Sequence, residues 1–166
     1  MARLGAAGQS WSPMEVTIVA GGHRPDEVER LLRDLPEWFG IEQSILSYAN
    51  AARTLPSTFA LRDDEVVGAC VVRHHTPAAA EIEVLAVKRA WHRQGIGRRL
   101  VQTVESGLCE NGVLLLEVKT RGPSGVSAEY ERTRAFYESI GFLPLEERTD
   151  IWGADNPCLI LVKPLT

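Results

Sequence analysis

The chain has 166 residues, of which 45% are hydrophobic and 24% charged, and its formal net charge is −4. This length is typical of one domain with a buried core, and the composition is that of a soluble globular protein. An acidic balance without a sustained basic run argues against a nucleic-acid-binding protein and favours a cationic small molecule or peptide as partner.

Residues 1–12 are rich in Ala, Gly and Ser, and we expect them to form a loose tail ahead of one domain over residues 13–166. The tail has too few apolar residues for the core of a signal peptide, and no run approaches the length that spans a bilayer. We therefore expect a cytoplasmic protein without membrane contact. A monomer and a homodimer are both compatible with the sequence.

The first half of the chain alternates between strand and helix patterns, as judged from the period of its apolar residues. A β-hairpin is predicted where two apolar runs flank Arg62-Asp63-Asp64-Glu65. The expected elements, in chain order, are a strand at residues 15–20, a helix from Pro25 through Leu32, a helix at 41–53, and strands at 57–61 and 66–73.

The second half continues this alternation. Residues 113–118 are apolar at odd and even positions alike, which predicts a strand covered on both faces. The expected elements are strands at 81–87, 113–118, 143–149 and 158–163, and helices at 97–110, stopped by Asn111-Gly112, and at 130–139. The sequence therefore predicts an α/β domain with one central sheet.

Cysteines and histidines give no sign of a disulfide framework or a metal site. Cys70, Cys109 and Cys158 are odd in number, far apart and in apolar contexts, which predicts buried thiols. His74 and His75 are adjacent, so on a strand they would point to opposite faces and could not share one ion. We expect no metal.

A glycine-rich turn leads from the strand at 81–87 into the helix at 97–110. It reads Arg93-Gln94-Gly95-Ile96-Gly97-Arg98, and Arg99 follows. The first N–H groups of a helix lack partners within it, the helix dipole is positive there, and glycines allow phosphates to approach the backbone. The arginines add charge suited to phosphate oxygens. We interpret the turn as a pyrophosphate cradle.

Two common nucleotide-binding patterns do not fit this turn. A P-loop needs Gly-Lys-Ser/Thr, which is missing, and the dinucleotide fingerprint needs a third glycine where this chain has Leu100. A protein that binds another phosphate ligand through the turn is therefore the least favoured hypothesis.

A second motif follows at Thr133-Arg134-Ala135-Phe136-Tyr137-Glu138-Ser139-Ile140-Gly141-Phe142. Two segments, in this order and spacing, resemble the signatures of the GNAT superfamily of N-acetyltransferases. The first comprises Leu85-Ala86-Val87, the glycine-rich turn and Leu100-Val101, and the second is this motif. The resemblance is centred on residues 80–142. It departs at Tyr130, where the family often has an asparagine that contacts the pantetheine arm, and at Thr133, where it has an alanine.

The resemblance implies a single-domain fold with a central mixed, mostly antiparallel sheet flanked by helices. It implies acetyl-CoA as co-substrate and direct transfer of the acetyl group to an amine in a ternary complex. The main chain of Leu85, Ala86 and Val87 would pair with the pantetheine and, where the strands splay, offer a free N–H to the oxyanion. The turn at 93–98, Arg99 and Thr133 complete the expected cofactor contacts.

Three side chains are candidates for catalysis, and a fourth is a fallback. The amine must lose a proton before it attacks, and Glu81 or Glu83, two positions apart on one strand face, could accept it directly or through water. His75 is the fallback base. Tyr137 shares a polar helix face with Tyr130 and Thr133, and we expect it to protonate the departing thiolate.

The acceptor pocket is expected near three aromatic residues. Trp38, Phe39 and Trp152 lie in segments where this superfamily builds that pocket, and they could contact a cationic amine or pack in the core. Arg134 is expected to face solvent. The leading hypothesis is an enzyme acetylating a primary amine of a small molecule or peptide, and the alternative is a non-catalytic acyl-CoA-binding sensor.

Overall fold

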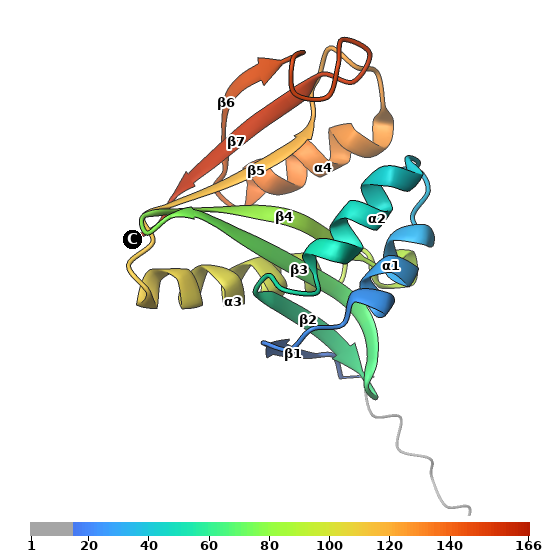
Figure 1. Ribbon diagram of the computed structural model, residues 1–166, viewed down its shortest axis with the longest axis vertical. Helices are drawn as coiled ribbons and strands as arrows, with labels where there is room; N and C mark the ends of the chain where they lie inside the picture. Colours follow the sequence, from blue (N-terminus) through green and yellow to red (C-terminus); the bar gives the residue numbers. More distant parts are fainter. Residues whose placement is uncertain (1–14) are drawn as a thin grey trace, which may run out of the picture.

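The computed structural model describes residues 15–166, and the tail expected at residues 1–12 lies outside this range (Figure 1). The predicted helices and strands are present with shifted boundaries. They are β1 (Thr17–Ala20), α1 (Pro25–Arg33), α2 (Glu42–Ala51), β2 (Ser57–Arg62), β3 (Glu65–Thr76), β4 (Ala79–Val87), α3 (Ile96–Glu110), β5 (Leu115–Arg121), α4 (Ala128–Ser139), β6 (Leu143–Arg148) and β7 (Cys158–Pro164).

All strands belong to one seven-stranded sheet with the order β1-β2-β3-β4-β5-β7-β6. Every neighbouring pair is antiparallel except β4 and β5, which are parallel. This confirms the predicted α/β fold with a central mixed, mostly antiparallel sheet. The single parallel pair stands where α3 provides the crossover that such a pair requires.

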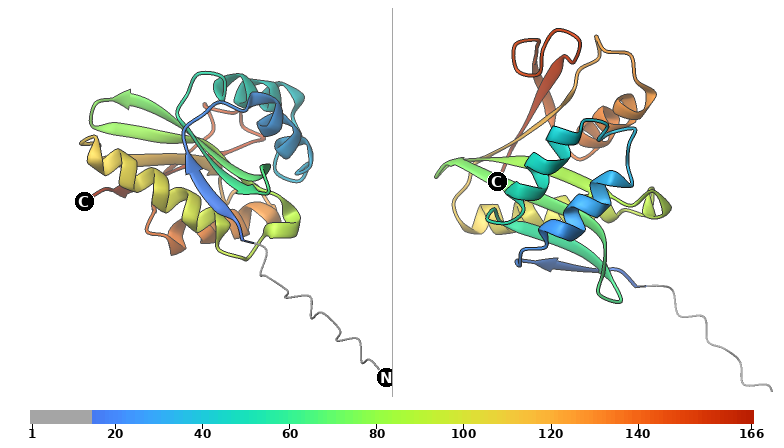
Figure 2. Two further views of the ribbon diagram at one scale, coloured as in Figure 1. Left: turned by 90° about the horizontal axis from the view of Figure 1, so that it is seen from below. Right: turned by 45° about the vertical axis from the view of Figure 1, so that its right-hand side comes forward.

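Helices cover both faces of the sheet (Figure 2). On one face, α1 and α2 pack on β2, β3 and β4, where Leu31 and Leu32 meet Phe59 and Val84 in one buried cluster. On the other face, α3 buries Leu100 and its neighbours against the same strands. Helix α4 lies beside β5 and β6.

Local sequence explains where two of the helices begin. Helix α1 has Pro25 in its first turn, acidic residues beside it, and arginines in its last turn, an arrangement that complements the helix dipole. Helix α4 is capped by Ser127, whose hydroxyl accepts the N–H of Tyr130 at 3.4 Å. Helix α3 begins after Gly95 without a side-chain cap, so its first N–H groups stay available.

Two expectations about burial were wrong in part. Strand β5 is covered on one face only, because α3 and α4 lie on the side of Leu116 and Val118 while Leu115 on the other side is 38% exposed. Cys70 and Cys158 are buried as expected, but Cys109 is only half-buried. Within residues 15–166, no cluster of three or more His, Cys, Asp or Glu could hold a metal ion.

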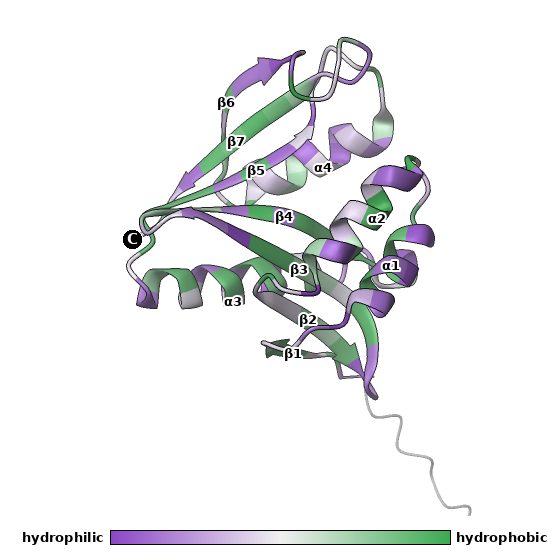
Figure 3. Cartoon of the chain, in the orientation of Figure 1, coloured by the Kyte–Doolittle hydropathy of each residue, from purple (hydrophilic) through white to green (hydrophobic). Residues whose placement is uncertain are grey.

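Hydropathy follows the layers of the fold (Figure 3). Much of β3, β4 and β7 is hydrophobic, whereas the edge strand β6 is exposed and ends in hydrophilic residues. Pro144 and charged residues in β6 discourage pairing with another chain. No helix in the described range is long and apolar enough to cross a membrane.

Candidate active site

The site lies where two neighbouring strands part. Strands β4 and β5 pair only through Ala79–Ile82 and Leu115–Val118. Beyond these pairs, β4 continues beside β3 and β5 continues beside β7, so the two halves of the sheet diverge (Figure 1). The structure therefore contains the splayed strand pair that the family resemblance implies.

Two backbone N–H groups of β4 point into this gap. The N–H of Lys88 donates to Val67 O of β3 at 2.8 Å. Because N–H directions alternate along a strand, the N–H groups of Val87 and Leu85 point away from β3, toward the side that β5 has left. On that side, His92 Nε2 donates to the carbonyl of Val87 at 2.6 Å. The main chain of β4 thus offers donors without a neighbouring strand.

The glycine-rich turn adds further free donors. Arg93 and Gly95 have φ values of 60° and 77°, in the left-handed region that glycine adopts readily and arginine does not. The N–H of Arg99 makes the first bond of α3, to Gly95 O at 3.0 Å, so the three N–H groups before it have no acceptor within the helix. A left-handed turn that feeds a helix N-terminus is a typical anion-binding arrangement.

The two glycines of the turn have different structural roles. A Cβ at Gly95 would meet nothing within 4 Å, so this position is open to a ligand. A Cβ at Gly97 would lie 3.2 Å from Phe136 Cζ, so Gly97 is also needed for the close approach of α3 and α4.

The structure separates the arginines of the turn. Arg93 and Arg98 line the cavity together with Gly95. Arg99 instead donates from Nη2 to Val16 O at 2.8 Å and ties α3 to the segment before β1. Gln94 donates from Nε2 to Ala90 O at 3.2 Å, within its own turn. Only part of the predicted phosphate set therefore faces the cavity.

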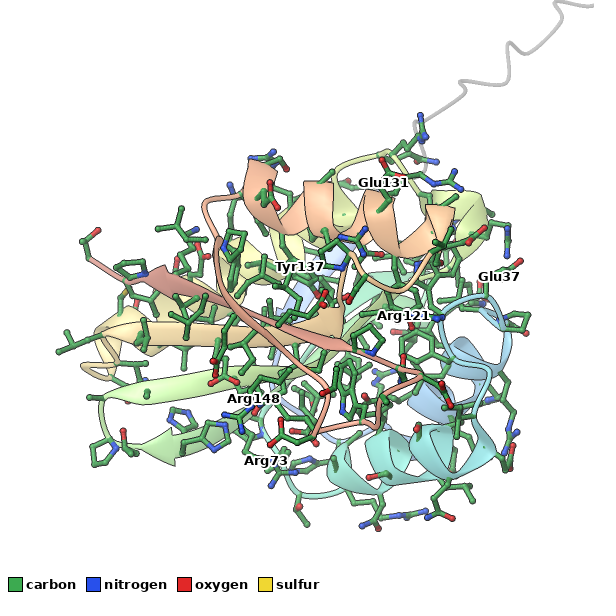
Figure 4. All side chains as sticks on the ribbon, turned by 90° about the horizontal axis from the view of Figure 1, so that it is seen from above. Glu37, Arg73, Arg121, Glu131, Tyr137 and Arg148 are labelled. Carbon is green, nitrogen blue, oxygen red and sulfur yellow. The ribbon has the colours of Figure 1, made fainter. Side chains whose placement is uncertain are left out.

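One cavity of about 910 Å³ joins the gap, the turn and the surrounding helices. Its walls come from the parted ends of β4 and β5, the start of α3, one face of α4, the segment around α2, and the loop between β6 and β7 (Figure 4). From the predicted site, the cavity walls include Glu83, Leu85, Ala86, Val87, Arg93, Gly95, Ile96, Gly97, Arg98, Thr133 and Tyr137.

Glu83 occupies a β-bulge at the mouth of the gap. Val71 pairs with Val84 and Val72 with Ile82, which leaves Glu83 without a partner on β3. Its carboxylate accepts two bonds from Arg73, at 2.8 Å from Nε and 3.1 Å from Nη2. Burial, together with the nearby Glu83 carboxylate, raises the pKa of Tyr48 to about 12, so its phenol is protonated beside this carboxylate.

Glu81 lies outside the cavity wall and is held by two hydrogen-bonding partners. It accepts from His75 Nε2 at 2.6 Å and from Lys119 Nζ at 2.8 Å. Despite the bulge at Glu83, both carboxylates act on Tyr48 and raise its pKa, which is consistent with the predicted common face of Glu81 and Glu83. Only Glu83 borders the cavity.

Tyr137 is buried rather than on a polar helix face, contrary to the sequence expectation. Its ring packs edge-to-face with Phe136 and Phe142, with centroid distances of 5.3 and 5.4 Å. It still borders the cavity with Tyr130 and Thr133, the residues predicted to share its face. Burial raises the pKa of the Tyr137 phenol, so the proton is retained at neutral pH.

Trp38 connects the α1–α2 turn to α4 across the cavity. Its indole donates to Thr133 Oγ1 at 3.1 Å, and its carbonyl accepts from the hydroxyl of Tyr130. Its ring meets His92 edge-to-face at 5.7 Å. Tyr130 and Thr133, the two residues that depart from the family pattern, thus both form hydrogen bonds with Trp38. Sequence reasoning missed this connection and His92, because nothing local marks either one.

The remaining predicted residues fall into two groups. Phe39 and Trp152 both border the cavity, and Phe39 also packs against the buried cluster of α1 and α2. Arg134, expected in solvent, donates from Nη1 to Arg121 O at 2.9 Å and is partly buried. His75, the fallback base, binds Glu81 and lies outside the cavity wall.

Comparisons with known proteins agree with this geometry. A curated relative, an uncharacterised N-acetyltransferase of Chlorobaculum tepidum, is 43% identical over 49 residues, which are 30% of this chain and 32% of that protein. The chain thus matches about a third of the length of this relative.

Solved structures match over nearly the whole chain. One from Desulfovibrio desulfuricans, assigned to the GNAT family, has a TM-score of 0.81 at 19% identity, covering 92% of this chain and all of that one. An aminoglycoside 6′-N-acetyltransferase complexed with coenzyme A has a TM-score of 0.73 at 19% identity, covering 90% of this chain and 97% of that one. These likenesses show the fold.

A family model settles the classification. The model of the acetyltransferase (GNAT) domain matches residues 56–144, more than half of the chain. This region contains the hairpin, the parted strands, the glycine-rich turn and α4. The chain belongs to the GNAT family of acetyltransferases.

Proposed function

We propose that the protein moves an acetyl group from acetyl-CoA to a primary amine of a small molecule or peptide, by direct attack in a ternary complex. The observation that carries the proposal is the gap between β4 and β5, whose free N–H groups at Leu85 and Val87 open into the same cavity as the N-terminus of α3. Acetyl-CoA carries a thioester, then an amide-containing arm, then a pyrophosphate. It therefore needs N–H donors along a strand edge for the thioester and the arm, followed by N–H donors at a helix N-terminus for the pyrophosphate.

The residues present fit acetyl-CoA. The N–H groups at the start of α3, with Arg93 and Arg98, suit the pyrophosphate, and the free edge of β4 suits the pantetheine amides. An N–H on this edge would also stabilise the oxyanion that forms on the acetyl group. A neighbour of the same fold was solved with coenzyme A.

Tyr137 is the proposed acid. Attack of the amine forms the C–N bond and the oxyanion, and when this intermediate collapses the C–S bond breaks and the departing thiolate takes a proton from the phenol. Burial raises the pKa of Tyr137, so the phenol enters the reaction protonated. Its position at the cavity wall, between the parted strands and α4, is consistent with this role.

Glu83 is the proposed route for the amine proton. A primary ammonium has a reference pKa of about 10.4 and must lose a proton before attack. Glu83 borders the cavity beside Tyr48, whereas Glu81 is held by His75 and Lys119 outside it. Because Glu83 is paired with Arg73, it would act through a water or as an electrostatic anchor for the ammonium.

The proposal is tested by thermal unfolding with acetyl-CoA, CoA, ATP and NAD, followed by a thiol-release assay on a panel of amines. Acetyl-CoA at a hundredfold excess over its Kd should stabilise the fold by about 2.7 kcal/mol. A variant with Arg93→Gln and Arg98→Gln should remain folded and respond less. Absence of a shift at millimolar acetyl-CoA contradicts the proposal, and binding without turnover of any amine would identify the sensor alternative.

A further inference from the structure

On the side of the cavity where Glu83 lies, each charged side chain of the strands except one forms an ion pair. Glu83 is paired with Arg73, and Lys119 is paired with Glu81 at 2.8 Å and Glu117 at 2.6 Å. Arg121, the last residue of β5, borders the same cavity but forms no ion pair or side-chain hydrogen bond with any residue in the range 15–166. It is a cation without a counter-ion.

The guanidinium of Arg121 is held in place by its surroundings. Its Nε is buried without a hydrogen-bond acceptor. The turn that follows β5 covers it, because a Cβ on Gly125 would lie 2.7 Å from Nε. The backbone is fixed as well, since Arg134 donates to Arg121 O and the N–H of Gly122 donates to Pro157 O at 2.7 Å. The covered Nε leaves the guanidinium partly desolvated, which is costly for an unpaired cation, and an anion in the cavity that binds its terminal nitrogens would relieve that cost.

Arg121 faces away from the helix that carries the phosphate turn. Leu116 and Val118 of β5 pack in the cluster under α3, and by strand alternation Arg121 belongs to the opposite face. Figure 4 shows Arg121 between α4 and the layer of α1 and α2. The same cavity contains Tyr48, Trp152 and Asn156 on this side. This is the side where the acceptor would enter, not the pyrophosphate.

We infer that Arg121 binds a carboxylate of the acceptor, so that the substrate is a primary amine that also carries a carboxylate group, such as an amino acid or a peptide with a free carboxyl end. The inference rests on the proposed function and specifies its substrate class. A guanidinium fork matches a carboxylate with two parallel hydrogen bonds. The local charge thus points to a zwitterionic acceptor and not to the purely cationic partner that the net charge of −4 favours.

The test compares matched probes with the full-length protein at saturating acetyl-CoA. One arm uses L-amino acids and their amides, and a second uses tripeptides that end in a free acid or an amide. Thiol release measures kcat/KM for each probe. For at least one parent amine, kcat/KM for the free-acid probe should exceed kcat/KM for its amide by about 10- to 100-fold, the range expected for a charge-assisted hydrogen-bonded pair. The arm that shows the preference identifies the amino acid or the peptide as the source of the carboxylate.

Two variants separate recognition from folding. Arg121→Gln should abolish the preference for the acid probe while kcat/KM for the amide and KM for acetyl-CoA stay unchanged. Gly125→Ala keeps the charge but displaces the guanidinium, so it should reduce the preference in the same way. Arg53→Gln removes an exposed arginine that makes only a 3.8 Å pair with Asp26, and it should leave the preference intact.

Three results would overturn the inference. The first is acetylation of neutral or cationic amines with no preference for the acid, and the second is absence of turnover and thermal stabilisation for every acid probe in protein that binds acetyl-CoA. The third is an Arg121→Gln variant whose KM rises for acetyl-CoA instead of the acceptor. Failure of acetyl-CoA itself to bind would contradict the proposed function, which is thereby tested separately.

Discussion

Tyr137 has two roles that a single substitution can separate. Its ring packs against Phe136 and Phe142 in the core, while the residue also borders the cavity. Tyr137→Phe keeps the ring and removes the hydroxyl. We expect kcat to fall by about 10²-fold, because a positioned acid contributes on this order, while the Kd for acetyl-CoA and the melting temperature change little. Steady-state kinetics under conditions where chemistry limits the rate would check this, and an unchanged kcat would exclude the acid role.

The raised pKa of Tyr137 predicts the pH dependence of the reaction. Burial favours the neutral phenol, so the acid form persists above the reference tyrosine pKa of about 10. The acceptor amine, in contrast, loses its proton as the pH rises. We expect kcat/KM for the acceptor to increase steadily from pH 6 to about 9.5 without a descending limb. A bell-shaped profile that disappears in Tyr137→Phe would show that the phenol ionises lower than its burial implies.

The sequence was sufficient to predict the type of site, but it did not predict several of the contacts that the side chains make there. It predicted the glycine-rich turn and Tyr137 from motifs, but it assigned Arg99 to phosphate and Arg134 to solvent. Both arginines donate to backbone carbonyls, at Val16 and Arg121. A carbonyl acceptor exists at every position of a chain, so no residue type marks such a contact in advance.

At the scale of elements, α3 offers two glycines for comparison, one at its N-cap that the proposed site needs and one in its interior that the site does not need. Gly95 has φ 77° at the start of the helix, whereas Gly107 lies inside it with open space around its Cβ position. Gly95→Ala should lower the free energy of unfolding by about 1–2 kcal/mol and weaken acetyl-CoA binding, because alanine strains a left-handed turn.

Gly107→Ala should have the opposite effect. Alanine in a helix interior with free space raises the free energy of unfolding by about 0.5–1 kcal/mol, without altering acetyl-CoA affinity. Urea denaturation and calorimetric titration of both variants provide the comparison. Equal losses of stability would mean that the turn does not require a left-handed residue at position 95.

Helix α4 shows why element-level prediction failed for burial. Tyr130 and Tyr137 share one face of this helix and Phe136 lies on the next, so no single apolar stripe marks the inner face. Tertiary contacts decide the orientation: Phe136 approaches Gly97 of α3, and Tyr137 turns into the core with Phe142. Helix α3, with its regular apolar spacing, was predicted with nearly the observed boundaries.

For the whole molecule, the decisive feature is a sheet that is continuous at one end and open at the other. The four residue pairs between β4 and β5 hold the halves together, and the ion pair of Lys119 with Glu81 spans the strands at the point where they part. Alternation of apolar residues predicts that strands exist, but parting strands have the same alternation as paired ones. The gap was therefore expected only from the family resemblance.

The most direct test of the account is amide hydrogen exchange of β4, resolved by NMR, with and without acetyl-CoA. In the free protein, the amides of Leu85 and Val87 should exchange fast while Ala86, which faces β3, is protected. Saturating acetyl-CoA should slow Leu85 and Val87, and the same concentration of ATP should not. Protection of both amides without a ligand, or none with saturating acetyl-CoA, would contradict binding in the gap between β4 and β5.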